Sequence, residues 1–269
     1  MLADQDARYL PLLVEPIRVC ADYKPKFGHG LQGACTLKDF QAMYRKDPFY
    51  AWFGLDNPLM YAAHKAAGGM TSIYRQIGIA CEHLFRAVLQ DQLGLSEEDS
   101  QWSYTVTGID KRTRKLKLDA RIPLEVVSDS SKREKVRVWV SEVSAHLKLN
   151  PRVAKALKGV VFEVRQGYKS KDSKRQNADI ANAATAYTQA YLPCVALLST
   201  QMDSDIVTRY RNERWAILVG RTGDASAIDS TYSFMRDVIG YDLAGFFQRH
   251  SEVLRTEVAK VLDKLLRTE

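Results

Sequence analysis

Four charged residues lie within or beside apolar runs of the sequence: Glu82, Asp119, Glu163 and Arg165. Residues two apart in an extended strand face the same side, so Glu163 and Arg165 would project together. Carboxylates on neighbouring strands could bind a hard divalent cation such as Mg²⁺, which lowers the pKa of a bound water. Hydrolysis of a phosphodiester needs such a cation to polarise the phosphoryl oxygen. Arg165 would be a fixed cation beside the phosphate, since arginine stays protonated and is a poor general base.

Each acid also has a purely structural interpretation. Asp119 alone is typical of an exposed strand residue, and Glu82 of a salt-bridged position at the margin of a helix. Glu163 could form a buried ion pair with Arg165. The occurrence of all three acids on successive elements favours the catalytic interpretation. The five histidines show neither metal-ligand spacing nor an obvious serine or cysteine partner, so we assign them no catalytic role.

The elements that would position these residues follow from the spacing of apolar side chains. Apolar residues recur every three or four positions along 72–93, which predicts an amphipathic helix that carries Glu82 and ends at Gly94. Strict alternation along 115–127 predicts a strand, with Asp119 on its polar face. This strand would pair with 102–110 through a basic turn.

The second half of the chain predicts further strands and helices. Val136, Val138 and Val140 alternate with polar residues and predict another strand. Short apolar runs predict strands and longer segments predict helices, in the order strand 160–164, helix 174–191, strand 194–199, strand 215–219, helix 232–239 and helix 243–266. Short strand–helix–strand connections produce parallel pairs. We therefore expect an α/β fold with a central mixed β-sheet flanked by helices.

This order of elements resembles the core of the PD-(D/E)XK nuclease superfamily, in which two strand acids converge on a divalent metal. Asp119 and Glu163 match the two acids, so the resemblance implies that they bind Mg²⁺, with Glu82 on the preceding helix. Arg165 stands where the family usually has lysine. A later lysine could supply that amine instead: Lys169, Lys171 or Lys174. The resemblance implies a restriction-endonuclease-like αβββαβ core over 72–222.

Two clusters of basic and polar residues predict contacts with DNA. One occupies the turn of the first hairpin and comprises Lys111, Arg112 and Arg114. The other follows the interior strand and comprises Lys169, Lys171, Ser173, Lys174, Arg175, Gln176 and Asn177. Lysine and arginine neutralise phosphates, while the neutral polar side chains can reach phosphates or base edges. The structural alternative is a solvated loop that ends in a helix cap at Ser173.

A donor-rich segment after the catalytic strand is similar to those of type II restriction endonucleases. The resemblance implies cleavage of double-stranded DNA at a specific short sequence, by a homodimer whose two-fold symmetry matches a palindrome. Two other functions stay open. A non-catalytic DNA-binding or regulatory module would use Glu163 and Arg165 as a structural pair. An RNA-processing nuclease is compatible with the charge, although no aromatic RNA-binding motif supports it.

Length and composition fit one elaborated domain over 1–269, in which 1–71 and 223–269 are helical extensions that grip DNA or form the dimer. The formal net charge of +7 permits a polyanionic partner. The four cysteines are widely separated and make no metal-binding pair, which indicates reduced thiols. No apolar run has the ~20 residues of a membrane span. We expect a cytoplasmic protein without a membrane partner.

Overall fold

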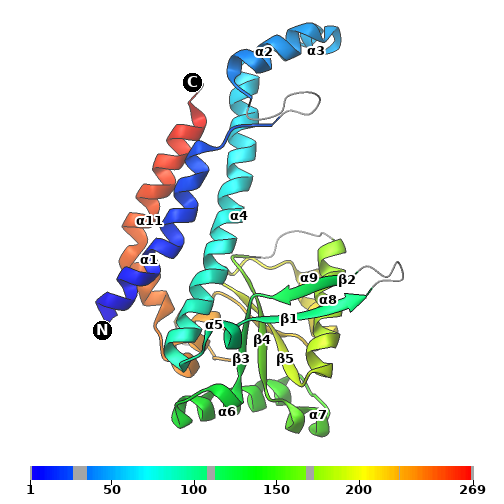
Figure 1. Ribbon diagram of the computed structural model, residues 1–269, viewed down its shortest axis with the longest axis vertical. Helices are drawn as coiled ribbons and strands as arrows, with labels where there is room; N and C mark the ends of the chain where they lie inside the picture. Colours follow the sequence, from blue (N-terminus) through cyan, green and yellow to red (C-terminus); the bar gives the residue numbers. More distant parts are fainter. Residues whose placement is uncertain (1, 27–34, 108–112, 168–172, 224, 268–269) are drawn as a thin grey trace. The chain divides into compact units, whose positions relative to one another are not determined.

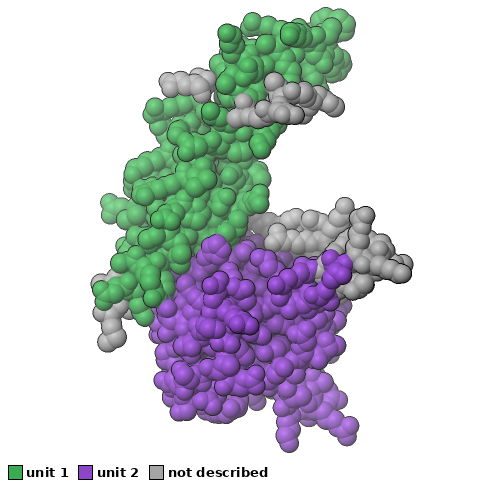
Figure 2. Space-filling view, in the orientation of Figure 1, with its two compact units in different colours: residues 1–80, 249–269 green, residues 81–248 purple. Residues whose placement is uncertain are grey.

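The computed structural model describes residues 2–26, 35–107, 113–167, 173–223 and 225–267. The chain divides into two compact units, shown in Figure 2: residues 1–80 with 249–269, and residues 81–248. The core expected over 72–222 shares most of its length with the second unit. None of the helices in the described ranges combines the length and apolar character that crossing a bilayer requires.

The first unit is built from helices. It contains α1 (Leu2–Val19), η1 (Cys20–Asp22), α2 (Leu37–Lys46), α3 (Pro48–Trp52), the first part of α4 (Pro58–Leu93) and the last part of α11 (Leu243–Leu266). Figure 1 shows α1, α4 and α11 side by side, and their contact is apolar: Ile17, Ile73, Val261 and Leu265 form one buried cluster. Lys65 is buried and donates hydrogen bonds to the backbone carbonyls of Lys264 and Arg267, at 3.2 and 3.0 Å.

The second unit is built on two β-sheets. A two-stranded antiparallel sheet contains β1 (Trp102–Thr107) and β2 (Thr113–Leu118). A four-stranded sheet contains, in spatial order, β3 (Ala120–Pro123), β4 (Gly159–Arg165), β5 (Tyr191–Leu197) and β6 (Ala216–Leu218). β3 is antiparallel to β4, whereas β4, β5 and β6 are mutually parallel. The fold is thus α/β with a mixed sheet, as the sequence predicted.

Helices cover both faces of the four-stranded sheet (Figure 1). On one face, Val161 and Val195 share a buried cluster with Ala183 of α8 (Ser173–Thr188) and Tyr210 of α9 (Ser204–Asn212). On the other face, the ring of Phe162 lies 5.1 Å from that of Phe85 on α4 and 5.6 Å from that of Phe234. Strand alternation sends neighbouring residues 161 and 162 to these opposite faces.

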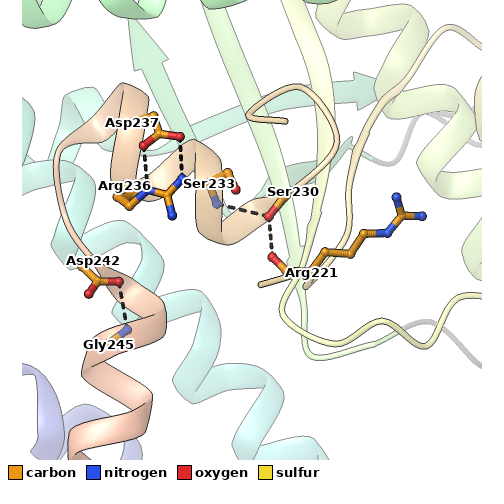
Figure 3. A network of polar contacts seen from close by, with 7 residues as sticks. All are labelled: Arg221, Ser230, Ser233, Arg236, Asp237, Asp242 and Gly245. Atoms are coloured by element: carbon orange, nitrogen blue, oxygen red, sulfur yellow. Dashed lines mark hydrogen bonds and ion pairs between the residues drawn. The ribbon is translucent and has the colours of Figure 1, made fainter. Parts of the chain in front are cut away.

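Short helices connect the main elements: α5 (Glu97–Ser100), η2 (Leu124–Val126), α7 (Pro151–Ala156), α10 (Thr231–Ser233) and the π-helix η3 (Phe234–Ile239). Figure 3 shows how side chains fix the path from β6 to α11. The Ser230 hydroxyl donates to the backbone carbonyl of Arg221 at 2.6 Å and accepts from the N–H of Ser233 at 3.1 Å. The Asp242 carboxylate accepts from the N–H of Gly245 in the first turn of α11.

The strand predicted at 136–140 is wrong, because these residues belong to α6 (Ser130–His146). Val136, Val140 and Val143 are buried at helical spacing, whereas Val138 is 46% exposed. The carboxylate of Asp129 caps this helix by accepting from the N–H groups of Ser131 and Lys132. The alternation of the three valines covers only five residues, which is too short to distinguish the two-residue period of a strand from the 3.6-residue period of a helix.

The single strand predicted at 115–127 is also wrong, because the chain leaves one sheet and enters the other within it. β2 ends at Leu118 and β3 begins at Ala120, and a 3-10 turn follows from Leu124. The backbone bends at Asp119. The helix predicted at 72–93 does end before Gly94, which has a left-handed φ of +67°, but it begins earlier, at Pro58.

Candidate active site

Asp119 is held at the bend between the two sheets by hydrogen bonds to β4. Its backbone N–H donates to the carbonyl of Phe162 at 2.8 Å. Its Oδ2 atom accepts from the backbone N–H of Val164, also at 2.8 Å. The carboxyl group therefore occupies a fixed position beside the end of β4, where Glu163 and Arg165 lie.

Glu82 on α4 forms a carboxyl pair with Asp119. Burial of this side chain, together with the charge of the neighbouring Asp119, raises the pKa of Glu82 to about 7. Burial also raises the pKa of Asp119, although the bond from Val164 and the charge of Arg165 oppose this shift. The negative charge of Asp119 thus favours the protonated form of Glu82, which keeps its proton to a higher pH than an isolated carboxyl group does.

Arg165 lies between two carboxylates. Its Nη2 atom is 2.8 Å from Oε1 of Glu163 and 2.8 Å from Oδ2 of Asp179 on α8. Asp179 also accepts a hydrogen bond from the hydroxyl of Tyr210 on α9. The Arg165 side chain is only 7% exposed. This buried triad fixes the direction of Glu163 and ties the end of β4 to the helices that cover it.

Two buried polar residues of this region escaped the sequence analysis. Asp179 and Asn182 both face the interior from α8, and Asn182 accepts a hydrogen bond from the hydroxyl of Tyr104 on β1 at 2.7 Å. A signal was present, because Asp179, Asn182, Ala183 and Ala186 recur at helical spacing on one face. Polar residues on an otherwise small and apolar helix face indicate a buried polar network.

The residues expected to contact DNA are only partly within the described structure. Lys111, Arg112, Lys169 and Lys171 lie outside the described residues. Arg114 belongs to β2, and α8 begins at Ser173 and contains Lys174, Arg175, Gln176 and Asn177, but only the backbone of these six residues is described. α8 begins at Ser173, one residue before the helix start expected from the sequence. Lys115 and Lys117 of β2 are exposed.

The carboxylates of this site could hold Mg²⁺ as a pair of oxygen ligands. No group of three or more His, Cys, Asp or Glu side chains is arranged around a common point in the described residues. Mg²⁺ in enzymes is commonly held by one or two carboxylates, with waters and substrate phosphates as the other ligands. The Glu82–Asp119 pair meets that requirement. Glu163 in this arrangement is directed to Arg165.

The structure thus places four of the five expected catalytic residues near one another. Glu82 lies beside Asp119, the charge of Arg165 opposes the rise in the pKa of Asp119 that burial causes, and Arg165 is paired with Glu163. The fifth, Lys169, lies outside the described residues. Comparison with protein-family models, curated proteins and solved structures gives no significant match to this chain. Its function is therefore argued from the site alone.

Proposed function

We propose that this protein is a Mg²⁺-dependent endonuclease that cleaves double-stranded DNA. The observation that carries the proposal is the half-buried Glu82–Asp119 carboxyl pair beside the buried Glu163–Arg165 pair at the end of β4. Carboxyl groups whose pKa is raised by burial and by a neighbouring like charge are typical of functional sites. A bound divalent cation would polarise the phosphoryl oxygen and lower the pKa of a water.

The side chains of the chain itself have distinct parts in this proposal. Asp119 and Glu82 supply oxygen ligands, and Asp119 is oriented by the N–H of Val164. Glu163 would become a further ligand by turning from Arg165, which then faces the scissile phosphate as a fixed positive charge. Arginine can stabilise charge that develops on the phosphate but cannot readily remove a proton from water.

The basic residues near this group are proposed to contact the DNA backbone. Lys115 and Lys117 are exposed on β2, which leads directly into Asp119. The segments around Lys111 and Lys169 add further positive charge. We further propose that the enzyme is a type II restriction endonuclease that acts as a homodimer on a palindromic site.

A second candidate function is a non-catalytic DNA-binding or regulatory module. The burial of Arg165 between Glu163 and Asp179 favours it, because a guanidinium shared by two carboxylates is a common structural device. In that case the triad holds β4 against α8 and α9, and the carboxyl pair has no reacting partner.

Incubation of the full chain with plasmid DNA, phage DNA and structured RNA, with and without Mg²⁺, separates these functions. Discrete DNA fragments that require Mg²⁺ are expected for a restriction enzyme, and a smear for a nonspecific nuclease. Asp119→Asn and Glu163→Gln should abolish cleavage and keep DNA binding, whereas Glu252→Gln, an exposed acid on α11, should cleave normally. Intact DNA with a gel shift would support the binding module. Cleavage of RNA alone would reject both DNA functions.

A further inference from the structure

A pocket of about 230 Å³ lies beside β6, the edge strand of the four-stranded sheet. Its walls come from the end of α6, the junction between α9 and β6, and the segment that contains Asp229. None of the residues of the candidate active site lines it. An inference about this pocket is therefore independent of the proposed nuclease function.

The lining of this pocket combines apolar residues with four basic side chains: His146, Lys148, Arg211 and Arg214. All four are exposed, and Asp229 is the one acidic residue among the described residues that line it. The Nη1 atom of Arg214 donates to the backbone carbonyl of Leu147 at 2.8 Å, which braces the end of α6. Within the described ranges, no hydrogen bond or ion pair engages the side chain of Lys148 or Arg211.

The two helix ends explain only part of this charge. Carbonyl groups at the C-termini of α6 and α9 carry partial negative charge, which basic residues can offset. Arg214 does so by direct contact with Leu147. Lys148 and Arg211 make no such contact in the described structure, so their charge is available to a ligand.

The backbone at two lining residues is also unfavourable for their side chains. Lys148 and Arg214 have left-handed φ values of +53° and +59° directly after α6 and α9. Glycine is the preferred residue at such positions, because other side chains are strained there. Strained residues that persist beside one pocket are typical of functional sites. Both positions carry a long basic side chain in place of glycine.

Trp215 also belongs to the lining, but its indole ring packs in the buried cluster with Tyr210 and its N–H is buried, so it is not a donor to the pocket. Among the described residues, the lining therefore offers four basic side chains and one carboxylate.

We propose that this pocket binds a small phosphate ester that also carries a hydroxyl group, such as a sugar phosphate. Lys148 and Arg211 bind the phosphate. The carboxylate of Asp229 accepts a hydrogen bond from a sugar hydroxyl, so the ester gains a contact that offsets the repulsion between Asp229 and its phosphate. The volume is below the ~300–1,000 Å³ of pockets for drug-sized ligands, so the ligand is a small one.

Calorimetric titration of the full chain with ribose 5-phosphate, inorganic phosphate and ribose at equal ionic strength tests this proposal. We expect saturable binding of ribose 5-phosphate, weaker binding of phosphate and no binding of ribose. Arg211→Gln should weaken binding of the ester at least tenfold. Arg152→Gln removes an equal charge from an exposed position on α7 and should leave binding unchanged.

Two further variants separate binding from folding. Lys148→Gly relieves the strain of the left-handed backbone, so it should raise the melting temperature of the free protein. The same variant should weaken binding of the ester. Asp229→Asn should bring the affinities for ribose 5-phosphate and inorganic phosphate closer together. Wild-type affinity in both Arg211→Gln and Lys148→Gly would overturn the proposal. Absence of ester binding to the wild-type protein would also overturn the proposal. If the same two variants then lost binding to duplex DNA, the pocket would be assigned to the DNA backbone.

Discussion

The carboxyl group of Glu82 on α4 lies beside the carboxyl group of Asp119, at the bend where β2 passes into β3, and the charge of Asp119 helps to raise the pKa of Glu82. Asp119 is in turn fixed by the backbone N–H of Val164. One residue thus joins a helix, a hairpin and the central sheet. This arrangement makes the charge and the hydrogen bonds of Asp119 separately testable.

The first prediction separates these two properties of Asp119. Asp119→Asn keeps an oxygen that can accept from Val164, whereas Asp119→Ala leaves the buried N–H without its partner, which costs about 1–3 kcal/mol. We expect Asp119→Ala to lower the urea midpoint clearly and Asp119→Asn to lower it little, although neither cleaves DNA. Equal stability of the two variants would show that the Val164 bond contributes nothing.

The second prediction concerns the pH dependence of stability. The pKa of Glu82 is raised from 4.5 to about 7 in the folded chain, so the folded state keeps its proton to a higher pH than the unfolded state. The contribution of Glu82 to stability is therefore greatest below pH 4.5 and is lost as the pH rises to about 7. Glu82→Gln should remove this decline, and the variant should be more stable than wild type at pH 8.

Urea unfolding at pH 5.5 and pH 8 measures this difference. Glu252→Gln is the control, because the exposed Glu252 on α11 should leave the pH profile of the wild type unchanged. A Glu82→Gln protein that still loses stability between these pH values to the same extent would contradict the carboxyl pair.

The third prediction addresses Arg165, whose two possible roles give different results. Arg165→Ala leaves Glu163 and Asp179 without their shared cation, which should cost about 3–5 kcal/mol if the triad is structural. If Arg165 also acts on the phosphate, Arg165→Ala should slow the chemical step by about 10²-fold or more, while Arg165→Lys keeps part of the rate. Melting temperature and single-turnover rate must be measured on the same preparations. A stable Arg165→Ala protein with an undiminished rate would reject both roles.

The fourth prediction concerns the exposed lysines of the hairpin. If Lys115 and Lys117 neutralise phosphates, alanine at either position should weaken binding to all DNA sequences and reduce the salt slope by about one unit. Lys155→Ala on α7 is a control of equal charge change. Filter binding over a range of salt concentrations gives the slopes, and identical slopes for all the proteins would remove the hairpin from the DNA interface.

The fifth prediction tests the packing of β3 against β4 with two glycines. A Cβ at Gly159 would lie 2.1 Å from the carbonyl oxygen of Ile122, so Gly159→Ala must displace the β3 backbone and should cost about 1–3 kcal/mol. Gly78 on α4 has open space around a Cβ, and Gly78→Ala should stabilise the chain by about 1 kcal/mol. Thermal unfolding of both variants measures the sign of each change in stability. A Gly159→Ala protein as stable as the wild type would contradict the close contact.

The sequence predicts the fold best where the apolar pattern is long. The helix at 243–266 is confirmed with its bounds, and the parallel pairing of the strands around Glu163 and Cys194 is confirmed. The pattern fails where it is short, as at Val136 to Val140. There, burial of Trp139 is needed to reveal a helical period.

The candidate site was predictable only in part, for a physical reason. Glu163 and Arg165 are recognisable because charged residues inside an apolar strand require partners. Asp179 and Tyr210 complete that network, but the contact depends on how α8 and α9 pack on the sheet, which local spacing does not determine. The bend at Asp119 is equally invisible, because alternation continues through it from Leu118 to Ala120.

The absence of a loop between β2 and β3 has a mechanical consequence. A rotation of the β1–β2 hairpin that breaks the bonds of Asp119 to Phe162 and Val164 would change the separation of its carboxyl from that of Glu82. A larger separation would weaken the repulsion and lower the pKa of Glu82. Binding at the hairpin and proton uptake at the bend are then linked equilibria, and each must shift the other by the same factor.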